Sequence, residues 1–178
     1  NGLKEYRGDQ VYSWLWEKSA INFEQMTNLP KSIRSILEDS FVINHVQINT
    51  IQKSKDGTIK NGIKLFDDLM VESVLIPTKK RITACISSQV GCAIGCTFCH
   101  TGTMGLTRHL TAGEIVGQFV AVTKFIKEQD GEGERLSNIV YMGMGEPLMN
   151  YKNVVEAIKM ITSKKGLGIS ARRIVVST

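Results

Sequence analysis

Residues 81–178 alternate between short apolar runs and longer stretches with helical periodicity, and this alternation restricts the fold to the α/β class. The apolar runs predict three strands, at 82–87, 138–142 and 173–177. The stretches between them predict two helices, which begin at Thr111 and after Asn150. Because a helical crossover joins parallel strands, we expect a β-α-β-α-β unit with all three strands in the same direction.

The first of these helices carries a start signal and an apolar face. Thr111 followed by Glu114 is a capping-box pattern, in which each side chain accepts a hydrogen bond from the backbone N–H of the other residue. Apolar residues recur at helical spacing in both helices, so one face of each should pack against the sheet. The residues predicted to point inward are Ile115, Phe119, Val122, Ile126, Val154, Ile158 and Ile161.

The first 80 residues predict two smaller parts. Residues 1–42 indicate a helical accessory module, and its expected core residues are Trp14, Trp16 and Phe23. The next part predicts a small antiparallel β meander with a hairpin turn at Asp56-Gly57, a weaker turn at 67–68 and a last strand that Pro77 stops. The three expected regions are therefore 1–42, 43–80 and 81–178.

The composition excludes several classes of protein. The 178 residues are 42% hydrophobic and 22% charged, with a formal net charge of +5, as in globular rather than disordered chains. No apolar run approaches the ~20 residues of a membrane-spanning helix, and four cysteines are too few for a disulfide scaffold. Residues 151–178 hold six basic side chains and one acidic side chain, a weak sign of a polyanionic partner.

Three cysteines, Cys92, Cys96 and Cys99, lie within eight residues after the first predicted parallel strand. Thiolates at such spacing bind zinc or an iron–sulfur cluster. A structural zinc ion usually takes four protein ligands, whereas the fourth cysteine, Cys85, lies inside the strand and no histidine follows zinc-finger spacing. Three thiolates on a four-iron cluster leave one iron open to another ligand, which fits a reactive cluster.

A second loop, Gly143-Met-Gly-Glu-Pro147, follows the second predicted parallel strand. Active sites of β/α barrels gather at the C-terminal ends of the strands, so the two loops should face each other. Glycines permit a ligand to approach the backbone closely, and Glu146 offers a carboxylate to an ammonium group. An ordinary turn would explain this segment alone, but its place beside the cysteines favours a binding site.

Together these motifs resemble the radical S-adenosylmethionine (SAM) superfamily, and most closely the RlmN-type methyltransferases, which methylate C2 of adenine in 23S ribosomal RNA and in transfer RNA. The resemblance covers essentially the whole chain. The matching stretches are 23–30, 83–92, 101–102, 110–115, 142–148 and 172–178. This resemblance implies an α/β fold, a radical SAM partial (β/α) barrel truncated after about three parallel strands, with the helical module and the β meander before it.

The resemblance also implies a role for each matching residue. Cys92, Cys96 and Cys99 would hold a [4Fe-4S] cluster whose open iron binds SAM. Gly145, Glu146 and Ser177 would contact the SAM. Glu72 would act as a proton acceptor, and Cys85 would help to resolve a covalent protein–RNA adduct. An exposed strand carboxylate and a buried core cysteine are the alternative interpretations of these last two residues.

The family reaction uses two SAM molecules. One methylates a cysteine near the C-terminus of the enzyme, and reductive cleavage of the other gives a 5′-deoxyadenosyl radical that activates this methyl group for addition to adenine. No cysteine follows Cys99 here, so we expect an N-terminal part of a longer protein that is inactive alone. The implied partners are RNA and an external electron donor, and the expected protein is a cytoplasmic monomer without a membrane segment.

Two other functions stay open at this point. A Cfr-type enzyme methylates C8 of adenine with the same cofactors, and Pro147 after Glu146 favours the C2 type instead. A zinc-stabilised RNA-binding protein without catalysis would need only the cysteines and the basic residues. Anaerobic reconstitution with iron and sulfide distinguishes this zinc protein from a radical enzyme.

Overall fold

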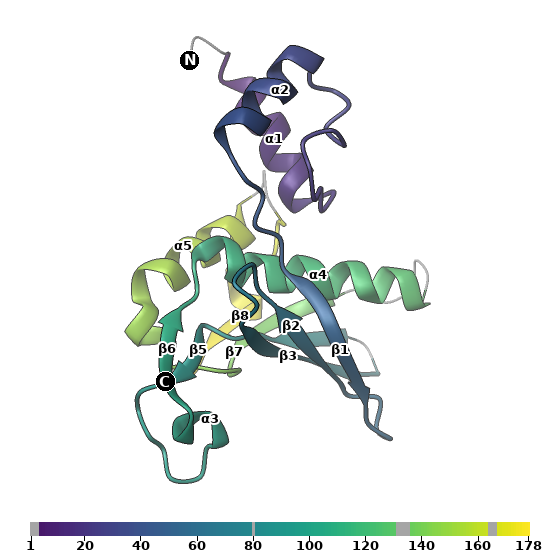
Figure 1. The fold of residues 1–178 in the computed structure, drawn as a ribbon. Coiled ribbons are helices and arrows are strands. Elements are labelled where there is room, and N and C mark those ends of the chain that lie inside the picture. Colours follow the sequence, from purple (N-terminus) through teal and green to yellow (C-terminus); the bar gives the residue numbers. More distant parts are fainter. Residues whose placement is uncertain (1–3, 80, 131–135, 164–166) are drawn as a thin grey trace.

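The computed structural model describes residues 4–79, 81–130, 136–163 and 167–178, and its centre is a six-stranded mixed sheet (Figure 1). The strand order is β1-β2-β3-β4-β7-β8. The strands are β1 Gln47–Lys53, β2 Ile59–Lys64, β3 Met70–Thr78, β4 Arg81–Cys85, β7 Leu136–Tyr141 and β8 Ile174–Val176. Neighbours from β1 to β4 are antiparallel, whereas β4, β7 and β8 are parallel. The predicted parallel unit is confirmed, and the meander continues its sheet. Lys164 and Lys165, two of the basic residues counted above, lie outside the described residues.

Two long helices connect the parallel strands and lie on one side of the sheet (Figure 1). They are α4, Ala112–Asp130, and α5, Tyr151–Thr162. Six of the seven residues predicted to point inward are buried, and Ile158 packs partly buried against the same core. The capping box is confirmed as well, because the Thr111 N–H donates to Glu114 Oε2 at 2.9 Å and the Glu114 N–H donates to Thr111 Oγ1 at 3.2 Å.

The alternation of side chains separates the two faces of the sheet. Leu75, Ala84 and Ile139 pair across neighbouring strands and belong to the core beneath the helices. Their sequence neighbours Val74, Cys85 and Val140 are also paired with one another, and therefore point to the opposite face. That opposite face is the one available for a site.

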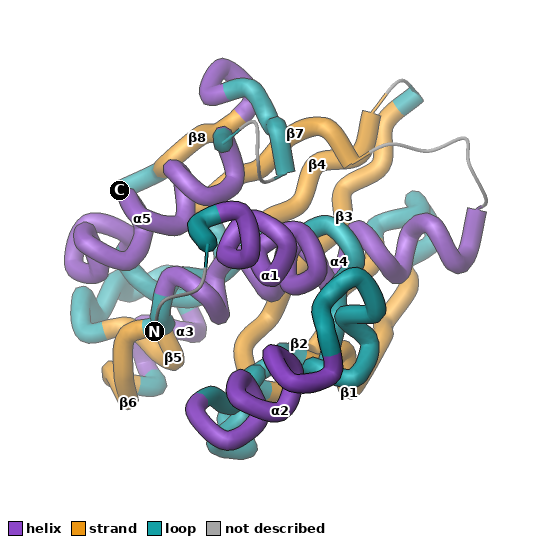
Figure 2. The backbone as a smooth tube through the Cα atoms, turned by 90° about the horizontal axis from the view of Figure 1, so that it is seen from above, coloured by secondary structure: helices purple, strands orange, loops and turns teal. Residues whose placement is uncertain are grey.

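The N-terminal helices form a small unit beside α4. They are α1, Tyr6–Trp16, and α2, Lys31–Ser40, and Figure 2 shows α1 lying over α4. The buried residues of this unit are Ala20, Phe23, Met26 and Leu29. Trp14 packs against them, but Trp16 packs against the main core. The expectation that Trp16 belongs to the core of the module is wrong, because this last residue of α1 faces α4 at Gly113.

The third strand does not stop where the sequence predicted. β3 continues through Pro77, which pairs with Ile82 of β4. The pairing of β3 with β2 ends earlier, at Leu75. Pro77 therefore lies where β3 has only one neighbouring strand, and such an edge position tolerates a residue that has no N–H to donate.

A two-stranded hairpin that the sequence did not reveal carries the cysteine loop. It consists of β5, Gln89–Cys92, and β6, Gly105–His109. At Gly91, which has φ of +77°, any Cβ atom would collide with the backbone of Gly105. The hairpin therefore needs glycine at that position. Its strands of four and five residues have too little alternation for the sequence to predict them.

Candidate functional site

The cysteine loop connects the two strands of the hairpin. Cys92 is the last residue of β5, and the loop continues through Cys96 and Cys99 into the short helix α3, His100–Thr103. The Cys99 N–H donates to the Cys96 carbonyl at 3.1 Å, which closes a turn between these two residues. The loop therefore leaves the hairpin, and not the parallel strand β4 directly as the sequence suggested.

The three loop thiols are free and half-buried. Within the described part of the chain, no three His, Cys, Asp or Glu side chains converge on a position for a single metal ion. A [4Fe-4S] cluster binds each thiolate through a different iron atom, so its ligands need not share one such position. Three soft, accessible thiols on one loop are a donor set that fits an iron–sulfur cluster.

The Gly-Glu-Pro turn is hydrogen-bonded to the segment that leads into the hairpin. The Met144 carbonyl accepts from the N–H groups of Ser88 at 2.9 Å and Gln89 at 3.2 Å. In return, the Met144 N–H donates to Ser87 Oγ at 2.8 Å, and the Glu146 N–H donates to Gln89 Oε1 at 2.7 Å. These bonds join the turn to the segment before β5, three residues from Cys92. That the turn also faces the cysteine loop itself stays a prediction.

Glycine is required in this turn, for a reason different from the one expected. Gly145 has φ of +96°, and a Cβ atom there would collide with the side chain of Gln89. A Cβ atom on Gly143 would lie 2.7 Å from Ser87 Oγ and 2.8 Å from the Ile86 carbonyl oxygen. The glycines therefore let the turn approach residues 86–89 of the same chain, and this close packing by itself requires glycine, without a ligand.

The predicted ligands of SAM lie at one edge of the sheet. Glu146 is half-buried, and its Oε1 accepts from the Leu148 N–H at 2.9 Å, which caps the 3₁₀ turn Pro147–Asn150. Ser177 is exposed and follows β8. The register pairs Val176 with Tyr141, and continuing it by one residue sets Ser177 beside Met142, at the start of the turn. No hydrogen bond or ion pair among the described residues joins the cysteine loop to Glu146 or Ser177.

Glu72 and Cys85 lie on the face of the sheet that α4 and α5 leave open. Val74 is directly opposite Cys85. Glu72 lies two residues before Val74 on the same strand and is therefore the diagonal neighbour of Cys85 on the same face. Glu72 is exposed and forms an ion pair with Lys60 at 2.9 Å. Cys85 is buried, and burial raises the pKa of its thiol, while a hydrogen bond with the Met142 backbone lowers it by a smaller amount.

Four buried polar residues that sequence reasoning missed hold these parts together. Gln118 of α4 binds both the N–H and the carbonyl of Ser87, each at 3.0 Å. The Ser87 hydroxyl donates to the Glu72 carbonyl at 2.6 Å. Asn150 donates to the carbonyls of Ser88 and Leu110, each at 2.8 Å. Together with Gln89, these side chains fix the connection from β4 to the hairpin.

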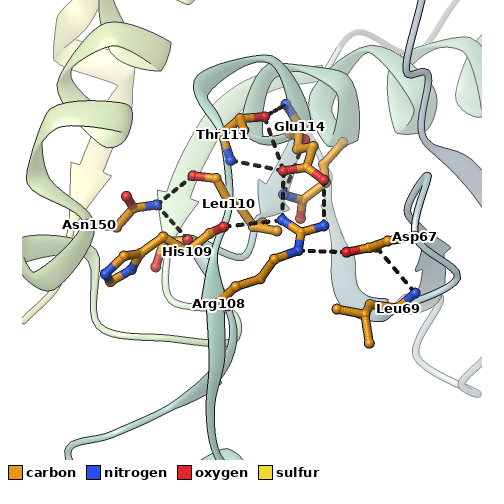
Figure 3. Close-up of polar contacts among 10 residues, drawn as sticks. Asp67, Leu69, Arg108, His109, Leu110, Thr111, Glu114 and Asn150 are labelled. Carbon is orange, nitrogen blue, oxygen red and sulfur yellow. Dashed lines mark hydrogen bonds and ion pairs between the residues drawn. The ribbon is translucent and has the colours of Figure 1, made fainter.

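Arg108 of β6 fastens the hairpin to α4 and to the turn before β3 (Figure 3). Its guanidinium makes two parallel hydrogen bonds to Glu114, at 2.8 and 3.0 Å, and a third to Asp67 at 2.7 Å. The Glu114 side chain is only 3% exposed. Burial by itself raises the pKa of Glu114, but hydrogen bonds from Arg108 and Thr111 outweigh burial and hold it below its ordinary value.

Acid is expected to destabilise the protein through Glu114 and Asp67. The hydrogen bond from Arg108 lowers the pKa of Asp67 as well. A carboxyl whose pKa is lower in the folded state contributes stability that is complete above its unfolded value of about 4 and is lost as the pH falls through its folded value. The urea midpoint should therefore decline below about pH 4, and less steeply in an Asp67→Asn, Glu114→Gln variant. Identical acid profiles would contradict this assignment.

A large apolar cleft lies elsewhere in the molecule. It has a volume of about 970 Å³ and lies between the N-terminal helices, the connector at 41–48 and α4. Leu15, Phe41 and Phe125 are among its lining residues, and none of the four cysteines lines it. Size alone would point to this cleft, but the polar and sulfur chemistry is at the hairpin. Among the described residues, no helix has the length and apolar character needed to cross a bilayer.

Comparison with known proteins agrees with the cysteine loop and the hairpin as the site of the chemistry. Residues 1–43 match the family model described as the ribosomal RNA large subunit methyltransferase N-terminal domain, and residues 86–178 match the radical SAM superfamily. The chain is 55% identical over 178 residues to the probable dual-specificity RNA methyltransferase RlmN of Flavobacterium johnsoniae, and 46% identical over 181 residues to RlmN of Desulfotalea psychrophila. These alignments cover 100% and 99% of the chain but 50% of each relative.

A solved structure shares the fold. The crystal structure of a radical SAM methyltransferase from Sphaerobacter thermophilus matches with a TM-score of 0.88 and 41% identity, over 99% of this chain and 51% of that one. The chain thus spans about half the length of the relatives it matches. Members of the radical SAM superfamily use a [4Fe-4S] cluster and SAM, in agreement with the donor set described above. With its cysteine loop, its Gly-Glu-Pro turn and a family model that matches more than half of its residues, the chain belongs to the radical SAM superfamily.

Proposed function

We propose that the full-length protein is an RlmN-type radical SAM methyltransferase that methylates C2 of adenine in large-subunit ribosomal RNA and in transfer RNA. The observation that carries the proposal is the set of hydrogen bonds between the Gly-Glu-Pro turn and residues 86–89. These bonds hold a carboxylate-bearing turn next to the strand that ends in Cys92, at the C-terminal ends of β4 and β7. Sites of β/α enzymes lie at such an edge.

In this proposal Cys92, Cys96 and Cys99 hold a [4Fe-4S] cluster. When bound, such a cluster supplies the electron that cleaves SAM. The three half-buried thiols remain accessible from solvent, so a cluster can be assembled on the folded loop. Because the loop is short and begins on a hairpin fixed by Arg108 and Gln89, the protein's contribution is to keep these ligands in place.

Gly145, Glu146 and Ser177 bind SAM in this proposal. Glu146 uses Oε1 to cap the Pro147–Asn150 turn, and within the described part of the chain Oε2 has no hydrogen-bond partner. That oxygen is free to accept a bond from the ammonium group of the methionine moiety. Ser177 is exposed at the same edge of the sheet, where its hydroxyl can contact the same ligand.

Glu72 and Cys85 carry the protein's own acid–base and thiol chemistry in this proposal. Burial raises the pKa of Cys85, so its thiol stays protonated at neutral pH until a base removes the proton. Glu72 is the diagonal neighbour of Cys85 on the open face and forms an ion pair with Lys60. A carboxylate there can accept a proton during release of the methylated RNA from the protein.

The remaining parts of the proposal concern the whole protein. The parallel strands β4, β7 and β8 would begin a partial (β/α) barrel, preceded by an accessory module at 1–42 and a meander at 43–80. RNA would contact the basic residues and the accessory module, with the target nucleotide presented out of its stack. The protein would be a cytoplasmic monomer that takes its electron from an external donor.

Anaerobic reconstitution of the full-length protein tests the proposal. With iron, sulfide, a chemical reductant and SAM, we expect a brown protein that releases 5′-deoxyadenosine and places a methyl group on C2 of adenine in RNA. The modified nucleoside is identified by mass spectrometry against C2- and C8-methyladenosine standards. Stoichiometric zinc without cleavage of SAM would contradict the proposal, and a C8 product would move the protein to the Cfr type.

Replacing Glu146 with alanine should weaken SAM binding at least about tenfold, since a charge-assisted hydrogen bond contributes about 1.5–3 kcal/mol. The iron content should not change, because Glu146 is not a cluster ligand. Glu156→Ala is the matched control, because that glutamate is exposed on α5 and its ion pair is with Lys159 on the same exposed helix face. Equilibrium dialysis of labelled SAM measures both variants; wild-type affinity in a folded Glu146→Ala protein would remove this residue from the site.

A further inference from the structure

Gln89 connects the hairpin to the Gly-Glu-Pro turn through both ends of its side-chain amide. Its Oε1 faces the Glu146 N–H at 2.7 Å, and its Nε2 faces His109 Nδ1 at 2.9 Å. The residue has 0% exposure, whereas His109 is exposed. A buried amide with both polar ends used is held in a single orientation, because any other orientation leaves a polar atom without a partner.

The chemistry of the partners decides which atom donates in each bond. The backbone N–H of Glu146 can only donate, so the atom of Gln89 that faces it must be the carbonyl oxygen. The other end is then an NH₂ group, which can also only donate. His109 Nδ1 must therefore accept, and this requires a neutral imidazole ring that carries its proton on Nε2.

We propose that Gln89 is a positioning residue, which holds the Glu146 turn through its oxygen and fixes the Nε2–H tautomer of His109 through its nitrogen. The inference rests on the proposed function, in which Glu146 binds SAM. Glu146 is then held at two points: Gln89 fixes its backbone N–H and Leu148 fixes Oε1. Oε1 has one of its two acceptor positions in use and Oε2 has no partner among the described residues, so Oε2 is the more available oxygen, and the carboxylate is oriented before the ligand arrives.

The close approach of the turn to Gln89 supports this role independently of the side-chain hydrogen bonds. The turn lies so close to Gln89 that a Cβ atom on Gly145 would collide with the Gln89 side chain. The carbonyl of Met144 also accepts from the Gln89 N–H at 3.2 Å. Gln89 thus contacts the same turn through its backbone N–H, through its side-chain carbonyl oxygen and through the packing of its side chain against Gly145. Such contacts are expected for a residue that sets the position of the turn.

Three variants separate the two ends of the amide. Gln89→Leu removes the acceptor for Glu146 and the donor to His109 with little change in volume. Gln89→Glu keeps an acceptor for the Glu146 N–H but replaces the donor to His109 with a second acceptor. His109→Ala removes only the partner on the hairpin side. Each is made in the full-length protein and prepared without cluster and SAM for spectroscopy, and with cluster for binding.

The first readout is nuclear magnetic resonance of the protein without cofactors, at a pH where free imidazole is neutral. In the wild type we expect an unprotonated Nδ1 and a protonated Nε2 on His109, assigned by the signal that His109→Ala removes. Gln89→Glu should move a proton to Nδ1, and Gln89→Leu should give a mixture of tautomers. Hydrogen exchange of the Glu146 amide should be about tenfold faster in Gln89→Leu than in Gln89→Glu.

The second readout is SAM affinity of the cluster-loaded protein. Gln89→Leu should bind SAM about tenfold more weakly at unchanged iron content, while Gln89→Glu and His109→Ala should stay within about twofold of the wild type. A protonated Nδ1 on His109 in the wild type would overturn the proposal. So would a Glu146 backbone amide that exchanges its hydrogen in Gln89→Leu at the same rate as in the wild type. Failure of the proposed function is distinct, because it would show as normal SAM binding by Glu146→Ala.

Discussion

Replacing Arg108 with methionine is expected to lower the free energy of unfolding by about 3–5 kcal/mol, the usual cost of removing one partner of a buried ion pair. The Glu114 carboxylate is almost completely buried and receives two hydrogen bonds from Arg108. Without the guanidinium, Thr111 is the one residue of the described chain that would still bind that charge. Arg108→Lys should recover only part of the loss, because an ammonium group cannot form the paired bonds of a guanidinium.

The control for this variant is Lys64→Met. Lys64 pairs with Asp68, whose side chain is 83% exposed, and the Lys64 side chain itself is 42% exposed, so loss of this solvated pair should cost at most about 1 kcal/mol. Urea denaturation followed by circular dichroism compares the two. The double variant Arg108→Met, Glu114→Leu should be more stable than Arg108→Met alone, because it no longer buries an unpaired charge. Equal destabilisation by Arg108→Met and Lys64→Met would show that the bonds of Arg108 contribute no more than a surface pair.

Each of Cys92→Ala, Cys96→Ala and Cys99→Ala is expected to abolish the brown cluster and all cleavage of SAM. A loop that offers only two thiolates leaves two iron atoms of a four-iron cluster without protein ligands. The measurements are iron and sulfide content after anaerobic reconstitution, the electron paramagnetic resonance signal of the reduced protein, and release of 5′-deoxyadenosine. All three variants should fold, because the loop cysteines are only half-buried and none of them belongs to the core clusters of the described residues.

Cys85→Ala is the matched control for the loop cysteines. Cys85 lies within β4 on the open face of the sheet, so the variant should keep its iron and its cleavage of SAM. In the proposed function it should still lose RNA methylation. A Cys85→Ala protein that fails to assemble a cluster would contradict the separation of roles, as would a Cys96→Ala protein that keeps a full complement of iron.

The alternation of apolar runs and helical periodicity in residues 81–178 was sufficient to predict much of the fold. In these residues the local preference for helix or strand and the pattern of buried side chains indicate the same structure. The apolar periodicity predicted α4, α5 and the parallel order of β4, β7 and β8, and the capping box at Thr111 and Glu114 was read correctly. The prediction that Pro77 ends the strand was wrong, because a residue without a backbone N–H is tolerated where β3 has only one neighbouring strand. The hairpin β5–β6 could not be predicted, since its short strands are paired through close backbone approach at Gly91.

The sequence by itself determined the candidate groups of the site and part of their setting: three closely spaced thiols, a carboxylate in a glycine-rich turn, and the order of strands and helices that places this turn at the C-terminal edge of the parallel strands. Only the tertiary structure decided how that edge is held together. Gln118 binds Ser87 across 31 residues of sequence, Gln89 binds Glu146 across 57 and Asn150 binds Ser88 across 62. Arg108 reaches Asp67 across 41. Their partners are backbone groups and charges that become neighbours only after the chain has folded, so no local pattern of residue types can reveal them.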